Sequence, residues 1–359
     1  MKNLIGTLKK TAVLSLVLGF LPLSAQAATT YGPEASASVV APQIVQQASS
    51  QSTSLLAGRI SQAVSSAVGS GFGGGFGGGL GSPQTAIIGG DGKAAGDSAK
   101  DTAMWLNIGN SWIENDQSGV DYSGQILTGL IGVDHQFNDQ FLAGVAFGYE
   151  NPDIDTKFNN GTFEGNNFTV SPYASYIFNK NFYVNGNVGY AVVDYDTSRN
   201  DGAITGDISG DRFFGDLSAN SRFELGGWDL RSTFGYMYLV ETQDAYTESG
   251  AGGNRIEEEK IHFGQWRLSG QAGYEFETQW GSIMPFGSVQ LEYDSIKPDA
   301  GVADQFGTPV ANDKFGATFG LGAQANIGDD LSLTVEGTTA QFREHLDVYS
   351  LTGTLRFKF

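Results

Sequence analysis

The sequence predicts a transmembrane β-barrel of twelve antiparallel strands, and three observations lead to this fold class. Glycine accounts for 51 of 359 residues and aromatic residues for 12% of the chain. Apolar and polar residues alternate from Met104 onward, in runs longer than the five or six residues usual in soluble sheets. The breaks between these runs are alternately short and long, which is typical of a barrel with tight turns at one end and loops at the other.

A secretory signal peptide is expected over residues 1–27. Three lysines precede the apolar stretch TAVLSLVLGFLPL, and Ala25 and Ala27 have the small-x-small spacing of a cleavage site. The stretch has 13 residues, which is too short to cross a bilayer comfortably and argues against a retained anchor. The mature chain is therefore expected to begin near Ala28 and to leave the cytoplasm.

Composition excludes several classes of function. Cysteine is absent, so neither disulfides nor a thiol-based metal site can form. Without the signal peptide, 39 acidic residues stand against 17 basic ones, a formal charge of −22. This excess argues against a nucleic acid as a partner, because binding to phosphates requires a basic face. We also expect no cofactor.

A short N-terminal segment, residues 28–102, precedes the predicted barrel. Residues 28–53 are rich in Ala, Ser and Gln, and we expect them to be flexible or loosely helical. Residues 54–68 place Leu56, Ile60, Ala63 and Ala67 on one stripe of an amphipathic helix. Residues 69–102 are so rich in glycine that they are interpreted as a flexible linker.

The barrel domain is expected over residues 103–359, with twelve strands. An even number of strands puts both ends of the domain on the periplasmic side. The last strand must pair with the first, because an open edge in lipid would leave backbone groups unpaired. The expected strands cover residues 104–116, 123–137, 141–151, 162–178, 182–198, 211–226, 228–242, 259–277, 282–295, 313–327, 331–343 and 345–359.

Short and long breaks alternate between these strands. Aromatic residues such as Phe137, Phe178 and Trp228 stand beside the short breaks, as in the interfacial girdle of a membrane barrel. A secreted β-sandwich would need shorter strands, and no fixed repeat supports a β-solenoid. Short turns are expected at 138–139, 179–180, 226–227, 277–281 and 328–330, and longer loops near 116–122, 151–161, 199–210, 243–259 and 296–312.

Residues 104–359 resemble the autotransporter β-domain, the translocator barrel of type V secretion. The matching segments are MWLNIGNSW, TGLIGVDHQF, LAGVAFGYE, VSPYASYIF, GYAVVDYDTSR, AYTESGAGG, LSGQAGYEF, IMPFGSVQLEY and the terminal TGTLRFKF, in that order. The resemblance implies a monomeric barrel in the bacterial outer membrane, surrounded by lipid and lipopolysaccharide. It also implies that periplasmic chaperones and the barrel-assembly machinery are partners, and that the machinery reads a C-terminal signal, here Leu355, Phe357 and Phe359.

The segment before the barrel departs from the family pattern. Family members carry a long secreted passenger joined to the barrel by a helix that threads the pore, whereas about 75 mature residues precede the barrel here. The first hypothesis is therefore a translocator that exports or displays a short N-terminal segment. The alternative is a structural or pore-forming barrel without secretion activity.

An enzymatic function is the third hypothesis, and it is disfavoured. Barrel hydrolases use a histidine at the rim together with a carboxylate or a serine. His262 and His345 fall near the expected extracellular ends of strands, while His135 falls near a periplasmic turn. We interpret His262 and His345 as solvated loop residues and His135 as an interfacial one.

Two polar loops and nine charged positions complete the candidate sites. The stretches NPDIDTKFNNGT and RNDGAITGDISGD contain several oxygen ligands, but neither has the spacing of a calcium-binding loop, so no metal site is predicted. Charged residues of both signs share the polar phase of the strands, which predicts a lumen that is wet or crossed by ion pairs around a plug. These lumen candidates are Arg222, Arg231, Arg267, Glu275, Glu292, Lys314, Glu336, Arg356 and Lys358.

Overall fold

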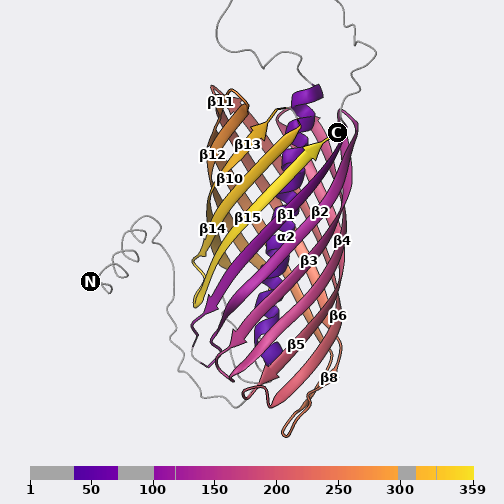
Figure 1. Ribbon diagram of the computed structural model, residues 1–359, viewed down its shortest axis with the longest axis vertical. Helices are drawn as coiled ribbons and strands as arrows, with labels where there is room; N and C mark the ends of the chain where they lie inside the picture. The colour runs from indigo at the N-terminus through magenta and orange to yellow at the C-terminus, as the bar shows by residue number, and fades with distance from the viewer. Residues whose placement is uncertain (1–35, 72–100, 118, 298–312, 329) are drawn as a thin grey trace, which may run out of the picture. The chain divides into compact units, whose positions relative to one another are not determined.

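In the part of the chain that the computed structural model describes, a closed barrel of twelve wall strands surrounds one helix (Figure 1). The structure describes residues 36–71, 101–117, 119–297, 313–328 and 330–359. The wall consists of β1 (Thr102–Asn115), β2 (Tyr122–Asn138), β3 (Phe141–Thr156), β4 (Gly161–Asn179), β5 (Phe182–Arg199), β6 (Ile204–Leu225), β7 (Trp228–Gln243), β10 (Glu259–Tyr274), β12 (Gly281–Ile296), β13 (Phe315–Ile327), β14 (Leu331–Gln341) and β15 (Leu346–Lys358). The predicted fold class and number of strands are confirmed.

Each wall strand pairs antiparallel with the next, and the last pairs with the first. The β1–β15 seam runs from Ala103 opposite Lys358 to Asn115 opposite Leu346, and the Phe359 N–H donates to the Thr102 carbonyl at 2.9 Å. Three short strands complete the fold: β8 (Tyr246–Thr247) and β9 (Arg255–Ile256) form a hairpin between β7 and β10, and β11 (Phe276–Thr278) follows β10 and pairs with β12. The seam that the sequence predicts is therefore present.

The two ends of the barrel differ in how the strands are connected. We call the end with the short connections the turn end and the other the loop end. Gly226 and Gly227 link β6 to β7 with φ angles of 57° and 88°, the left-handed backbone that a two-residue hairpin turn requires. The chain's C-terminus also lies at the turn end, whereas the β8–β9 hairpin lies at the loop end (Figure 1).

Two segments that the sequence suggests are loops are mostly strand. The predicted loops at 151–161 and 199–210 are wrong, because β3 continues to Thr156, β4 begins at Gly161 and β6 begins at Ile204. In these stretches Ile154, Ile204 and Ile208 are buried, while their strand neighbours Asp153, Asp155 and Asp207 are polar and exposed. Apolar and polar residues still alternate here, but the apolar side chains point inward and the polar ones outward, the reverse of the rest of the wall. The segments therefore look like polar loops in the sequence although they are strands.

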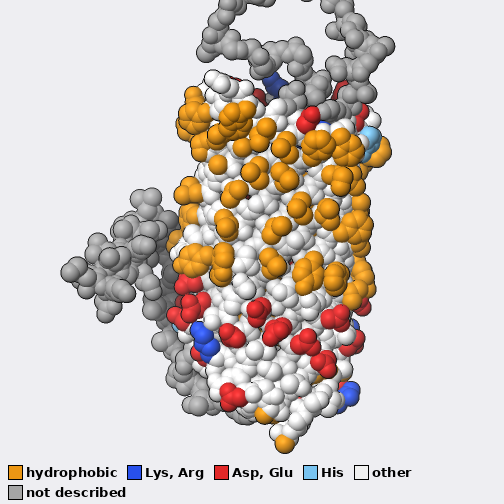
Figure 2. Space-filling model, in the orientation of Figure 1, with side chains coloured by type: hydrophobic (Ala, Val, Ile, Leu, Met, Phe, Trp, Pro, Cys, Tyr) orange, Lys and Arg blue, Asp and Glu red, His pale blue; other side chains and the backbone are white. Residues whose placement is uncertain are grey.

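The outer surface shows the same change of polarity. Apolar side chains, including Phe147, Phe168 and Leu217, form a belt toward the turn end (Figure 2). Acidic side chains follow this belt toward the loop end. The belt is the part of the surface suited to lipid, and the acidic zone beyond it is suited to water.

Helix α2 (Ser36–Gly71) lies within the barrel and is longer than the sequence predicts. The expected helix of residues 54–68 is wrong in its start, because residues 36–53, expected to be flexible or loosely helical, are also helical. Among the residues of this helix whose burial the structure describes, Ser54 and Gly58 are exposed. A helix enclosed on nearly all sides has no single apolar stripe, so the periodicity that marks a surface helix is missing.

Some expectations cannot be compared with the structure. The signal peptide of residues 1–27 with its cleavage site, most of the linker of residues 69–102 and most of the loop at 296–312 lie outside the described residues. In the described part of the chain, no helix is both long and apolar enough to pass through a membrane.

Candidate functional site: the helix-filled lumen

Helix α2 lies off-centre in the lumen. It approaches β2, β3, β4 and β5 most closely, and β7 to a lesser extent. On the side toward β10, Ser54 is exposed inside the barrel and accepts a hydrogen bond from Arg267 Nη1 at 3.3 Å. The lumen is therefore closely filled along one wall and open beside the helix along another.

The first residue of the helix is bonded at the loop end. Ser36 Oγ donates to the Ser198 carbonyl at 2.6 Å and accepts from Asn159 Nδ2 at 2.8 Å. Its hydroxyl also lies 3.1 Å from Thr156 Oγ1. These contacts place the start of the helix between the ends of β3 and β5, which fixes its direction through the barrel.

The first turns of the helix pack in a hydrophobic core. Val40, Ile44 and Ala48 are buried against inward residues of the wall such as Ile154 and Phe163. At about 25 cal/mol per Å² of buried apolar area, such a core contributes several kcal/mol. The loop-end half of the barrel is thus stabilised like the interior of a soluble protein.

Neutral polar side chains hold the middle of the helix. Gln43 accepts hydrogen bonds from Asn115 and Tyr122, and Gln46 Nε2 donates to Asp294 Oδ2 at 3.3 Å. Gln51 accepts a bond from Thr128 at 3.4 Å. The bonds of Gln46 and Gln51 are long, so their contribution to helix docking is modest.

Arg59 makes the strongest contact of the helix toward the turn end. Its Nη2 lies 2.7 Å from Asp134 Oδ2 on β2, and both side chains are almost fully buried. Its guanidinium carbon lies 5.6 Å from the ring centroid of Trp105, within the range of a cation–π contact. Arg356 on β15 approaches the other oxygen of Asp134 at 3.5 Å, so two arginines share one carboxylate.

The ion pair is supported by aromatic side chains that lie over glycines. Trp105 Nε1 donates to the Tyr173 hydroxyl at 2.9 Å, and that hydroxyl donates to Asp134 Oδ2 at 3.3 Å. A Cβ at Gly132 would come within 2.5 Å of the Trp105 ring, and one at Gly144 within 2.5 Å of Tyr173. Both glycines are therefore required for the rings to lie flat on the wall beside Asp134.

Three further groups of ion pairs line the lumen, in addition to the pairs that Asp229 makes at its turn end. Arg212 binds Glu150 at 3.1 Å and Glu241 at 2.7 Å, with Tyr195 within hydrogen-bond distance of Arg212 Nη2. The other two groups are Arg267 with Asp216, and Arg343 with Glu292 and Asp294. Buried charges are tolerated only when they are paired, and these pairs satisfy that condition.

The nine lumen candidates from the sequence occupy different environments. Five of them face inward and contact a charged partner: Arg222 and Arg231 both bind Asp229, Arg267 binds Asp216, Glu292 binds Arg343, and Arg356 approaches Asp134. Glu336 accepts a hydrogen bond from Ser288 at 2.8 Å. Glu275 and Lys314 lie exposed at strand ends, and Lys358 is half-buried at the end of β15.

The predicted C-terminal signal lies on the outer face of the last strand. Leu355, Phe357 and Phe359 are 44%, 49% and 51% exposed, as expected for side chains that face lipid. The rings of Phe357 and Phe359 stack with centroids 6.2 Å apart.

The three histidines take separate partners. His262 lies 3.1 Å from the Tyr238 hydroxyl, His345 pairs with Asp116 at 2.7 Å, and His135 lies 2.9 Å from Thr102 Oγ1. None of these contacts joins His262 to His345. Within the part of the chain that the structure describes, no group of three or more acidic or histidine side chains is placed to hold a metal ion.

Sequence reasoning missed several charged residues of the lumen. Arg59, Asp134 and Arg212 were not among the lumen candidates, although Asp134 and Arg212 share the inward phase of their strands. A signal was available, because a charged residue in the inward phase of a lipid-facing strand must have a partner in the lumen. Glu248 of the β8–β9 hairpin, which pairs with Arg199 at 2.7 Å, had no such periodic signal.

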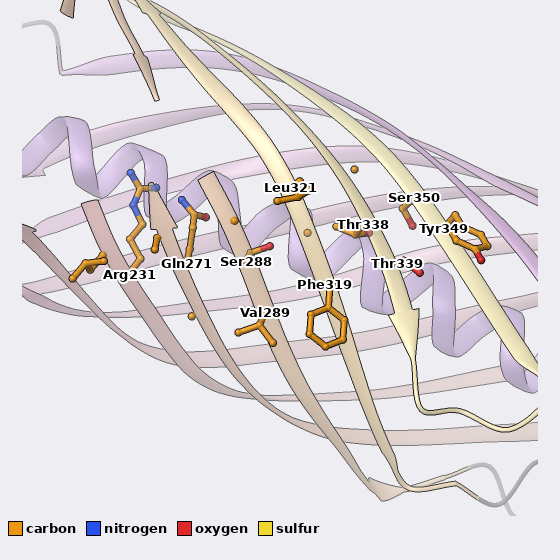
Figure 3. Close-up of a pocket in the computed structure, with 16 residues that line it drawn as sticks. Arg231, Gln271, Ser288, Val289, Phe319, Leu321, Thr338, Thr339, Tyr349 and Ser350 are labelled. Carbon is orange, nitrogen blue, oxygen red and sulfur yellow. The ribbon is translucent and has the colours of Figure 1, made fainter. Parts of the chain in front are cut away.

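A depression of about 1010 Å³ lies across β7, β10, β12, β13, β14 and β15 (Figure 3). Val289 and Phe319 point away from the helix there, while Arg231, Gln271 and Ser288 point toward it. Glycines such as Gly270, Gly287 and Gly337 make this wall thin. It is the part of the barrel opposite the strands on which the helix leans.

Comparisons with known proteins agree with this architecture. The chain is similar to the translocator domain of the autotransporter NalP from Neisseria meningitidis, with 15% identity, a TM-score of 0.61, and coverage of 74% of this chain and 90% of that one. It is also similar to the β-domain of the Bordetella autotransporter BrkA, with 18% identity, a TM-score of 0.54 and coverage of 72% and 100%. The transport unit of AIDA-I from Escherichia coli gives 11% identity, a TM-score of 0.51 and coverage of 74% and 92%.

At these identities the solved structures establish the fold alone, and no curated protein matches the chain in sequence. The family itself is established by the sequence match to the autotransporter beta-domain, which covers residues 104–338. This chain therefore belongs to the autotransporter β-domain family and is a bacterial outer-membrane barrel.

Proposed function

We propose that this barrel carries its own N-terminal segment outward through its lumen and keeps α2 there as a plug. The direction of the helix carries the proposal. Ser36 is bonded at the loop end, and Arg59 is bonded to Asp134, four residues before the end of β2 at the turn end. In outer-membrane barrels the turns face the periplasm and the loops face the exterior. Residues before Ser36 are then outside the cell, and the segment that joins α2 to β1 is periplasmic.

The absence of cysteine makes a direct test possible. Single-cysteine variants Thr29→Cys, Thr247→Cys and Asp139→Cys are treated on intact cells with a membrane-impermeant maleimide. Thr247 is an exposed residue of the loop-end hairpin, and Asp139 is an exposed residue of a turn. We expect labelling of Thr29→Cys and Thr247→Cys, and none of Asp139→Cys. Protection of Thr29→Cys at the level of Asp139→Cys would refute export of the segment.

The partners follow from this function. We propose that the monomeric barrel is surrounded by lipid and lipopolysaccharide, is escorted by periplasmic chaperones, and is inserted by the barrel-assembly machinery through Leu355, Phe357 and Phe359. The outward direction of these three side chains supports this role, because a receptor can reach them before lipid covers the strand.

A pore without secretion activity is the second candidate function. The open space beside Ser54 favours it, because a helix that leans on one wall leaves room for ions along the other. In planar bilayers we expect a small conductance from the full barrel and a larger one after deletion of residues 28–102. Absence of current from both proteins would exclude the pore.

We infer that the protein is not an enzyme. His262 lies beside the Tyr238 hydroxyl, and His345 pairs with the exposed carboxylate of Asp116. These separate partners support the inference, since a rim hydrolase needs its histidine to contact both a nucleophile and an orienting carboxylate. A hydrolytic activity of the purified barrel that is lost in His262→Ala or His345→Ala would contradict the inference.

A further inference from the structure

Two asparagines on β5 are buried in the lumen without a hydrogen-bond partner. Asn185 and Asn187 are 2% and 5% exposed, and neither carboxamide bonds to another protein group. On the neighbouring strand, Asp216 binds Arg267 through Oδ2, while its Oδ1 has no partner. We call Asn185, Asn187 and Asp216 the β5–β6 polar patch.

Nearby polar side chains on the same wall are satisfied. Ser175 donates to the Val184 carbonyl at 3.1 Å, and Asn220 both donates to Ser218 and accepts from Thr233. The strands can therefore pair their inward polar groups in this region. Elsewhere on the wall, Asn107 and Gln265 each leave one carboxamide atom unpaired but bond through the other, whereas Asn185 and Asn187 leave both atoms unpaired.

An unpaired buried carboxamide is unfavourable, and an apolar residue of the same shape would suit the helix-filled lumen better. Buried polar groups that weaken a finished fold are typical of positions that serve another state. In this barrel the other state is the one before α2 is docked, when the N-terminal segment is still moving through the lumen.

The geometry of the patch matches an extended polypeptide. Asn185 and Asn187 are alternate residues of one strand, so they stand about 7 Å apart, the same repeat as alternate peptide groups of an extended chain. Asn187 lies directly opposite Asp216 in the strand pairing. Each carboxamide offers a donor and an acceptor, which together are the complement of a peptide group.

Charge also favours a polypeptide of this composition. Arg267 neutralises Asp216, so the patch presents hydrogen-bonding groups of little net charge. Residues 28–58 of the chain carry one ionisable acid, Glu34, and no base. A patch of little net charge suits a nearly neutral segment. Hydrogen bonds from the patch to the backbone of that segment do not depend on which side chains the segment carries.

We propose that the β5–β6 polar patch is a transient binding track for the backbone of the N-terminal segment during its passage through the lumen. The inference rests on the proposed export function and assigns a role to specific lumen residues within it. When α2 docks, the segment moves on and the carboxamides lose their peptide partners.

The test replaces both asparagines by leucine in the full chain carrying Thr29→Cys. Pulse-labelled cells are sampled with the impermeant maleimide to measure how fast Thr29→Cys reaches the surface. We expect Asn185→Leu/Asn187→Leu to slow this step about tenfold, the effect of losing two modest hydrogen bonds in the moving state. The urea midpoint of the finished barrel is expected to stay the same or to rise, because two unpaired groups have been removed.

A polar double variant distinguishes the loss of hydrogen-bonding groups from the change in side-chain shape. Asn185→Ser/Asn187→Ser keeps a donor and an acceptor at each position, so its labelling rate should be close to that of the parent chain. The amount of barrel inserted is monitored with Thr247→Cys in parallel, because slow insertion would also delay the label. Equal insertion with delayed labelling is the result that supports the track.

Three results would overturn the proposal. A lower urea midpoint in the leucine variant would mean that ordered water pairs the carboxamides in the docked state, which gives them a structural role only. An unchanged labelling rate would mean that the moving segment does not use them. If the parent Thr29→Cys chain is never labelled, the N-terminal segment is not exported, and both the proposed function and the binding track are wrong. This result is obtained from the parent chain alone, so it is distinguishable from a failure of the track.

Discussion

The turn-end and loop-end halves of this barrel follow opposite polarity rules, although the same strands build both. Toward the turn end, apolar residues such as Phe147 and Leu217 point outward, and charged residues such as Asp134 point inward. Toward the loop end, Ile154 and Phe163 point inward, and the exposed outer positions are largely polar. The difference shows which solvent each half meets: lipid surrounds one half, and water surrounds the other.

Helix α2 reflects the same division. Its first turns pack through Val40 and Ile44 into the hydrophobic core of the loop-end half, whereas Arg59 is held by charge in the turn-end half. A hydrophobic contact has little directional preference, but a buried ion pair fixes one arrangement of the two elements. The core thus favours a helix in the lumen, and the Arg59–Asp134 pair fixes its position along the barrel.

The largest expected effect follows from Asp134→Asn, which removes the carboxylate from the turn-end half. Arg59 would then remain buried beside Arg356 without the carboxylate that both of them approach. Breaking a buried pair by removing one partner typically costs about 3–5 kcal/mol. We expect a loss of this size in the free energy of unfolding, measured by urea titration of the barrel in lipid.

A second substitution shows whether charge is the cause. Arg59→Gln alone should cost less than Asp134→Asn, because Arg356 can still pair with Asp134. Arg59→Gln combined with Asp134→Asn should recover part of the stability that Asp134→Asn loses. A double variant less stable than Asp134→Asn would show that packing around Trp105, and not charge, holds the helix.

The next effect compares the two outer surfaces directly. Leu217→Lys places a charge in the apolar belt, where lysine at the bilayer midplane costs about 2–4 kcal/mol. Asp153→Lys places the same side chain on an exposed outer position of β3 toward the loop end, where a change of about 0.5 kcal/mol or less is expected. Equal losses in the two urea titrations would mean that the acidic zone is also in lipid.

The polarity rules explain which parts of the fold the sequence could predict. Twelve strands and the closing seam follow from long runs of alternation with apolar residues outward, because a soluble sandwich would need shorter strands. The segments 151–161 and 199–210 were misassigned because Ile154, Ile204 and Ile208 reverse the phase. A reversal of phase in a polar stretch indicates a strand that leaves the membrane, and it could be used as a signal.

The candidate site could be predicted only in part. Inward charges such as Arg267 and Arg356 were found from their phase, but their partners were not, because pairing depends on which residues reach the same level of the lumen. Arg59 and Asp134 are 75 positions apart in the sequence and belong to a helix and a strand. The start of α2 was missed because the barrel encloses it, which removes the one-sided pattern on which the prediction of residues 54–68 relied.

A smaller and pH-dependent effect is expected at the β8–β9 hairpin, beyond the belt. Burial raises the pKa of the Glu248 carboxyl, but hydrogen bonds from Arg199 and from the Asn254 N–H outweigh it and hold this pKa below its usual range. A lowered carboxyl pKa stabilises the fold above the pKa of an unfolded glutamate, about 4.3, and this stabilisation is lost as the pH falls through the folded-state value. We therefore expect the hairpin to become protease-sensitive on acidification below about pH 4.

Glu248→Gln should open the hairpin at neutral pH, with a loss of about 1–3 kcal/mol in the free energy of local opening, and should remove its dependence on acid. The matched control is Glu257→Gln, which removes an exposed pair with Arg255 and should have almost no effect. Equal protection of the hairpin in both variants would show that the Arg199–Glu248 pair does not hold it in place.

The smallest effect on the finished fold is expected from deletion of Phe359. Its ring is half exposed on the outer face, and its N–H makes one backbone hydrogen bond across the seam, so its loss should cost about 1 kcal/mol in the urea titration. If Leu355, Phe357 and Phe359 are the signal that the assembly machinery reads, the same deletion should reduce the amount of barrel in the outer membrane several-fold. Such a reduction could not come from so small a loss of stability, because a barrel of ordinary stability remains almost fully folded after losing about 1 kcal/mol. Normal membrane levels of the truncated chain would mean that the terminal aromatic residue serves the seam alone, and that assembly depends on some other feature of the last strand.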